Sequence, residues 1–116
     1  MDQKEFELLV VELCKLPSLA EGLAWLKASE DTDIAEAANA LTGQFALAEV
    51  EGERRIYHVF NEENEAGELT EYVEHVMNEG DHLVKFAAWF FSTYFDMKPK
   101  EVYQAAGKTY QQPKRG

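Results

Sequence analysis

The sequence has one cysteine, three prolines and no apolar run that is long enough to cross a bilayer. Cys14 has no second cysteine with which to form an internal disulfide, and a lone thiol among apolar neighbours suits a reducing compartment. The longest apolar stretch, residues 86–91, is far shorter than the roughly 20 residues of a transmembrane helix. The acidic, amphipathic start at residues 1–9 is unlike a secretory signal peptide. These absences predict a cytoplasmic protein that does not bind membranes.

Positive charge is also scarce. The chain has 11 Lys and Arg against 22 Asp and Glu, which gives a formal net charge of −11. Binding a phosphate backbone requires clustered Lys and Arg, so the charge argues against direct contact with nucleic acid. From a length of 116 residues and a hydrophobic content of 46%, we expect one domain with one core over residues 1–107. A basic, disordered tail is expected over residues 108–116.

Familiar catalytic and cofactor motifs are missing as well. The chain has no G-x-x-x-x-G-K phosphate loop, no G-x-G-x-x-G fingerprint and no paired cysteines. His58 is interpreted as a structural or solvated histidine, and Cys14 lacks the electropositive setting that activates a nucleophilic thiol. We therefore expect a non-enzymatic protein without a cofactor.

Glu71 and His75 form the pattern that comes nearest to a metal site. On a helix the two side chains would share one face, with Glu74 adjacent and Asp81-His82 just beyond. A single Glu-x-x-x-His pair without a second histidine at ligand spacing is a weak signal. We therefore predict a hydrogen-bonded surface pair and no metal.

Most of the chain follows a helical pattern. Apolar residues at helical spacing predict short helices near residues 2–15, 18–29, 32–41, 68–78, 81–95 and 99–106. Pro17 ends the first of these helices and Ser18 caps the second. Gly80 ends the helix at 68–78, and Asp81 is expected to cap the next one.

Residues 44–60 fit two patterns. The β-branched and aromatic residues at 55–60 predict a strand that pairs with residues 45–50 across a turn at Glu51-Gly52. The alternative continues the helical stripe of residues 34–41 through Ala48. We favour the hairpin because a strand at 55–60 needs a partner and no other strand is predicted. The expected fold is a helix-dominated α+β domain with five to six short helices and one β-hairpin, with an all-α bundle as the alternative.

The predicted helix at 81–95 is apolar on nearly all sides. Phe86, Phe90 and Tyr94 fall on one stripe and are expected in the core. Trp89 and Phe91 point elsewhere, so we assign them to a partner interface or to a second packing layer.

The most distinctive feature is a segment that carries charge of one sign. Between Asn61 and His82 the chain has eight carboxylates and no Lys or Arg: Glu62, Glu63, Glu65, Glu68, Glu71, Glu74, Glu79 and Asp81. Residues 97–116 have the opposite bias, with five basic residues and one glutamate. A surface with charge of one sign steers oppositely charged molecules toward it. The segment therefore predicts where a basic partner binds.

The spacing of these carboxylates suggests a sharper hypothesis. On a helix, Glu68, Glu71 and Glu74 would form a row with an axial step of about 4.5 Å. One strand of DNA presents a phosphate about every 3.4 Å along its axis, so the row is a candidate DNA mimic. The competing interpretation is a solvated helix face that keeps the protein in solution.

These features favour a small non-enzymatic inhibitor or adaptor that binds a basic, nucleic-acid-binding surface of a larger protein. Small acidic domains from phages and mobile elements, including anti-restriction and anti-CRISPR proteins, act in this way, and the analogy is one of size and charge. The alternatives are an immunity or antitoxin protein against a nuclease toxin, and an assembly subunit that forms a homodimer through its aromatic helix. The expected partner-binding residues are the eight carboxylates together with Trp89 and Phe91.

Overall fold

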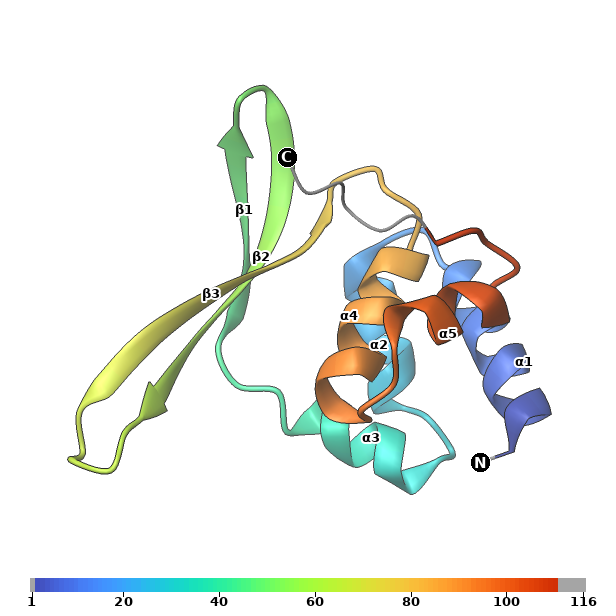
Figure 1. Ribbon diagram of the computed structural model, residues 1–116, viewed down its shortest axis with the longest axis horizontal. Coiled ribbons are helices and arrows are strands. Elements are labelled where there is room, and N and C mark those ends of the chain that lie inside the picture. Colours follow the sequence, from blue (N-terminus) through green and yellow to red (C-terminus); the bar gives the residue numbers. More distant parts are fainter. Residues whose placement is uncertain (1, 111–116) are drawn as a thin grey trace. The chain divides into compact units, whose positions relative to one another are not determined.

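The computed structural model describes residues 2–110 and has an α+β architecture of five helices and a three-stranded antiparallel sheet within that range (Figure 1). The elements follow one another as α1 (Gln3–Cys14), α2 (Leu19–Lys27), α3 (Thr32–Asn39), β1 (Gln44–Val50), β2 (Glu53–Glu63), β3 (Leu69–Asn78), α4 (Val84–Tyr94) and α5 (Pro99–Ala105). The expected fold class is confirmed. The chain divides into a helical unit, which ends at Ala38 and resumes at His82, and a sheet unit, Asn39–Asp81. The prediction of one domain over residues 1–107 stays a prediction.

Side-chain caps begin the first three helices. The Asp2 carboxylate accepts the amide N–H of Glu5 at 2.8 Å. The predicted cap at Ser18 is confirmed, because its hydroxyl accepts the amide N–H of Glu21 at 3.3 Å. Asp31 Oδ1 accepts two amides at the start of α3. Each bond satisfies a backbone donor that the helix leaves unpaired.

The predicted cap of α4 is wrong. Asp81 Oδ2 accepts the amide N–H of Asn78 at 2.9 Å and so closes the turn that follows β3. The N-cap of α4 is Leu83, and the N–H of Val84 donates to Nδ1 of His82 at 3.1 Å. The helix therefore begins later than expected, because the Asp81 carboxylate serves the preceding turn.

Aromatic rings of α4 form the centre of the helical core. Phe86, Phe90 and Phe91 are fully buried, and the rings of Phe91 and Phe6 meet edge to face at 5.2 Å. Such geometry adds about 0.5–1.5 kcal/mol beyond the burial of apolar area. Tyr94, which was expected in the core, is 39% exposed because it lies at the last turn of α4.

The predicted hairpin at residues 44–60 is confirmed as β1 and β2. Its turn residues Glu51 and Gly52 both have positive φ angles, 51° and 82°. A two-residue turn with φ above zero at both positions matches the right-handed twist of the strands that it joins.

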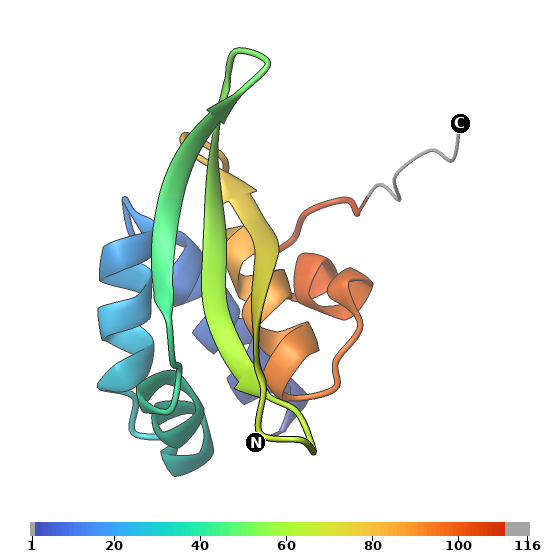
Figure 2. The same cartoon turned by 90° about the vertical axis from the view of Figure 1, so that its left-hand side faces the viewer.

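The predicted helix at 68–78 is wrong, because Leu69–Asn78 is the third strand. Its apolar spacing suits a helix, but its β-branched and aromatic residues suit a strand equally well. β1 pairs with one edge of β2 up to Val59, and β3 pairs with the other edge from Arg55 to Glu63. Pairing of these backbone groups decides between the two structures. Figure 2 shows the resulting sheet from its face, with the two turns at opposite ends.

Gly43 is a point where the sheet unit tolerates no side chain. Its φ is +78°, and an added Cβ would overlap the Val59 carbonyl oxygen and lie 2.9 Å from Phe60 Cβ. Gly43→Ala should lower the free energy of unfolding by about 1–3 kcal/mol from backbone strain, and the steric overlap should add to that loss.

Urea denaturation measures the loss, and Gly52→Ala is the matched control. Gly52 also has a positive φ, +82°, but its Cβ would meet no atom within 4 Å. The control variant therefore has strain without overlap. Equal losses in the two variants would contradict the close approach at Gly43.

Candidate protein-binding surface on an acidic hairpin

The end of the β2–β3 hairpin gathers exposed negative charge. We call residues 60–73 the acidic hairpin. It carries five exposed glutamates and no lysine or arginine: Glu62, Glu63, Glu65, Glu68 and Glu71. The arginines of the sheet unit lie toward the other end, where Arg54 binds Glu79 and Arg55 binds Glu53, each at 3.1 Å. Both arginines of the sheet unit therefore lie outside residues 60–73.

The turn of the acidic hairpin is held by Asn64. Its side-chain Oδ1 accepts the amide N–H groups of Ala66 at 3.0 Å and Glu68 at 2.9 Å. Its backbone N–H donates to the carbonyl of Glu68, and Gly67, with a φ of +81°, donates to the carbonyl of Asn64. An asparagine that bonds its own turn in this way is a recurrent device of loops. The glutamates of the turn are therefore carried on an ordered backbone.

Because residues 69–78 form a strand and not a helix, the carboxylates lie on different faces from those predicted. Glu63 lies opposite Leu69 and Asn61 lies opposite Glu71, so Glu63, Leu69 and Glu71 share one face of the hairpin. Glu62, opposite Thr70, lies on the other face. The predicted helical row is therefore wrong: Glu71 and Glu74 are three residues apart on a strand and point to opposite faces.

Exposed apolar side chains accompany this charge. Leu69 is 71% exposed and Val73 is 57% exposed, and both share the face of Glu63 and Glu71. The helical interpretation placed these two residues on a buried stripe and so missed them. If residues 69–78 are assigned to a strand, Leu69 and Val73 fall on the same face as Glu71, and exposed apolar residues of this kind indicate a binding surface.

The opposite face carries a row of rings. The ring of Phe60 stacks on His58 at 5.0 Å and on Tyr72 at 5.5 Å, and His58 also contacts Phe45 at 5.2 Å. His58 is buried and its Nε2 lies 2.7 Å from the Thr42 carbonyl oxygen. The row therefore links all three strands of the sheet, and His58 packs within it.

The remaining predicted site residues lie elsewhere. Glu79 is paired with Arg54, Asp81 closes the turn after β3, and Glu74 lies opposite buried His58. Trp89 is half-buried, with ring contacts to Phe86 and Tyr94. Phe91 is only 1% exposed and packs on Phe6, so its assignment to a surface interface is wrong and it belongs to the core.

In the part of the chain that it describes, the structure brings no metal-binding cluster together. No cluster of three His, Cys, Asp or Glu there has the geometry to hold an ion. Glu71 and His75 share a face of β3, but four residues of a strand span about 13 Å. His75 Nε2 instead lies 2.8 Å from Asn78 Oδ1.

Two titratable groups of the helical unit have shifted pKa values. Burial raises the pKa of the Cys14 thiol to about 11, and the smaller opposing effect of Lys108 does not reverse this. At neutral pH the thiol is therefore protonated. Burial, with a further contribution from Lys108, lowers the pKa of His82, which favours the neutral ring that accepts the Val84 amide.

The described part of the basic tail, residues 108–110, contacts α5. Lys108 donates its backbone N–H to the Tyr103 carbonyl at 2.8 Å, and the rings of Tyr103 and Tyr110 lie 5.0 Å apart. The expectation of a disordered tail over residues 108–116 stays a prediction, and residues 111–116 lie outside the described range. None of the described helices is both long enough and apolar enough to span a membrane.

Comparison with known proteins gives no significant match to a protein-family model, to a curated protein sequence or to a solved structure.

Proposed function

We propose that this chain is a non-enzymatic binding protein that docks its acidic hairpin on a basic, nucleic-acid-binding surface of a larger protein. The observation that supports the proposal is the set of five exposed glutamates on an ordered hairpin that carries no basic residue. By occupying that surface, the chain acts as an inhibitor of the larger protein.

Charge and shape contribute to such binding in different ways. A concentration of charge of one sign raises the association rate with a basic partner, up to about 10⁸–10⁹ M⁻¹s⁻¹ at low salt. The exposed side chains of Leu69 and Val73 supply apolar contacts that slow dissociation. Because Asn64 orders the turn before binding, less conformational entropy is lost on docking.

The proposal rests on charge density rather than on imitation of phosphate spacing. Glu63 and Glu71 share a face from two neighbouring strands, and no two glutamates of the acidic hairpin follow each other on one face of a strand, so the expected helical row with its step of about 4.5 Å does not form. An immunity protein against a nuclease toxin would use the same surface, and only the identity of its target would differ.

Affinity capture followed by a displacement assay tests the proposal. The tagged chain is used to isolate its partner from host cells, and the purified partner is bound to a fluorescent duplex DNA or to a single-stranded RNA. Adding the chain should release the nucleic acid in proportion to occupancy. A partner that keeps its nucleic acid bound at saturating concentrations of the chain would contradict inhibition by occupation.

The association rate should also fall steeply as salt is added. Attraction between exposed charges is screened over about 10 Å at 0.1 M ionic strength and about 3 Å at 1 M. Stopped-flow measurements from 0.02 to 0.5 M NaCl, roughly the range in which screening changes most, should show the association rate falling before the dissociation rate changes. A rate that stays constant would exclude electrostatic steering by the acidic hairpin.

A further inference from the structure

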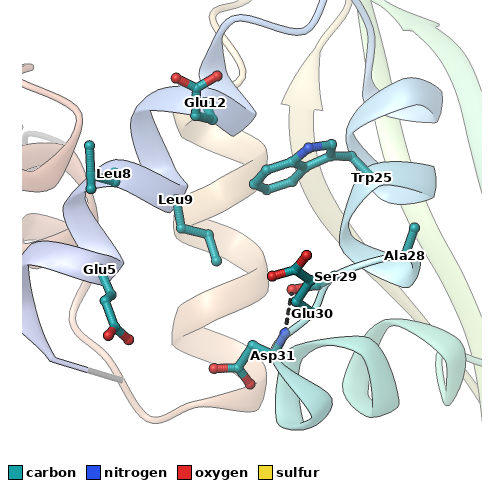
Figure 3. A pocket seen from close by; sticks show the side chains of 9 residues that line it. All are labelled: Glu5, Leu8, Leu9, Glu12, Trp25, Ala28, Ser29, Glu30 and Asp31. Carbon is teal, nitrogen blue, oxygen red and sulfur yellow. Dashed lines mark hydrogen bonds between the residues drawn. The ribbon is translucent and has the colours of Figure 1, made fainter.

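The helical unit has an open groove between α1 and the end of α2 (Figure 3). Its volume is about 470 Å³, within the range of about 300–1,000 Å³ that is typical of ligand sites. α1 forms one wall, while α2 and the turn that leads into α3 form the other. The groove lies within one unit and is separate from the acidic hairpin.

The floor of this groove is apolar. Figure 3 shows the Trp25 indole reaching toward α1 and the Leu9 side chain pointing into the space between the helices. Both residues are half-buried, and Leu8 on the outer side of α1 is 66% exposed. Trp25 and Leu9 keep accessible apolar area inside the groove, and a bound apolar side chain would remove that area from water.

The rim of the groove is acidic. Glu5 and Glu12 stand on α1, and Glu30 and Asp31 stand on the opposite wall, while none of the residues that line the groove is a lysine or arginine. Glu12 forms an ion pair with Lys15 at 3.0 Å. Both side chains are more than half exposed, so this ion pair contributes little free energy. A neighbouring hollow shares Asp31 and adds two further aspartates, Asp2 and Asp33. The residues that line the groove and this hollow therefore include several carboxylates and no lysine or arginine.

We infer that this groove binds an amphipathic basic segment of a partner protein, with a large apolar side chain inserted over Trp25 and Leu9. The apolar floor accepts the anchor residue, and the four carboxylates of the rim pair with lysine or arginine on either side of it. This is the helix-in-groove mode of recognition, in which apolar residues on one stripe of a helix enter a groove. A guanidinium or ammonium beside Trp25 also gains from the face of the indole.

A model peptide tests the inference. The probe is a fluorescent helical peptide of about 18 residues with leucine on one stripe and lysine elsewhere. A first control peptide replaces the leucines by serine and keeps the charge, and a second replaces the lysines by glutamate. We expect the leucine–lysine peptide to bind at least about tenfold more tightly than either control by fluorescence anisotropy. Equal binding of the serine–lysine peptide would overturn the inference, because it would show that charge alone accounts for the affinity.

Two matched pairs of variants locate the binding. Ala28→Arg places a long cation in the groove, and Ala20→Arg places the same side chain on an exposed position of α2 outside it. Glu30→Lys and Glu36→Lys form the corresponding pair for charge. The groove variants should lose at least about tenfold in affinity, while each control stays within about twofold of the original chain. Loss of affinity in a control variant equal to that of its groove partner would overturn the inference.

Amide chemical shifts separate this site from the acidic hairpin. In ¹H–¹⁵N spectra, the peptide should shift residues of α1, of the end of α2 and of the turn before α3. Shifts confined to residues 61–71 would overturn the inference. A variant with Glu63 and Glu71 changed to lysine should still show these peptide-induced shifts at the groove, so failure of the groove and failure of the proposed function can be distinguished.

Discussion

Changing Glu63 and Glu71 together to lysine should weaken binding to the partner by about 100-fold. The two glutamates lie on one face of the acidic hairpin, beside Leu69 and Val73, so a basic partner would meet two repulsive charges in place of two attractive ones. Close charge pairs at interfaces have coupling energies of about 1.5–7 kcal/mol, and 1.4 kcal/mol corresponds to a tenfold change in affinity. Surface plasmon resonance at fixed salt measures the effect on both rate constants.

The matched control changes Glu7 and Glu36 to lysine. Both residues are exposed, lie on helices and give the same change in net charge, from −11 to −7. This control should reduce affinity by no more than about tenfold, through the loss of long-range steering. Thermal midpoints of both variants should stay close to the original, because exposed substitutions usually change stability by under about 0.5 kcal/mol each. Equal loss of affinity in the two variants would mean that the acidic hairpin is only a solvated surface.

The second large effect concerns the helical core. Phe90→Ala should lower the free energy of unfolding by about 3–5 kcal/mol, because the ring is fully buried and truncation leaves a cavity among other rings. That is a large part of the roughly 5–15 kcal/mol that stabilises a typical domain. Tyr94→Ala, at a position that is 39% exposed, should cost less. A smaller loss for Phe90→Ala than for Tyr94→Ala would contradict the packing described for α4.

Tryptophan fluorescence makes this measurement specific. Trp25 and Trp89 both lie in the helical unit, so their emission reports the unfolding of that unit, while amide signals of β2 report the sheet unit. If residues 1–107 form one cooperative domain, Phe90→Ala should shift both transitions together. Separate transitions, with only the fluorescence one shifted, would contradict that prediction.

Local sequence signals determined most of the helical unit. Ser18 caps α2 as predicted, Pro17 precedes its start, and the apolar spacing located α1, α2, α3 and α5 to within a few residues. These features are readable because helix caps and helical periodicity depend on residues that are close in the chain. The turn at Glu51-Gly52 was readable for the same reason, since a two-residue turn depends on its own φ angles.

The charge of the candidate site was also readable from the sequence, but its geometry was not. The cluster of glutamates between Asn61 and His82 follows from composition alone. Leu69, Tyr72, Val73 and Val76 fit a helical stripe and also suit a strand, and nothing local separates the two structures. The difference decides whether Glu71 and Glu74 share a face and whether Leu69 and Val73 are exposed.

Only tertiary pairing decided the structure of residues 69–78. β1 occupies one edge of β2, and the backbone groups of the other edge, from Arg55 to Glu63, are paired with β3. A backbone donor or acceptor left unpaired costs more than the difference in local preference between helix and strand. The sequence by itself determined the helices, the first hairpin and the location of the charge. The pairing of β3 with β2 places the glutamates on a hairpin beside exposed Leu69 and Val73. It prevails over the local helical periodicity because it pairs backbone groups of distant segments.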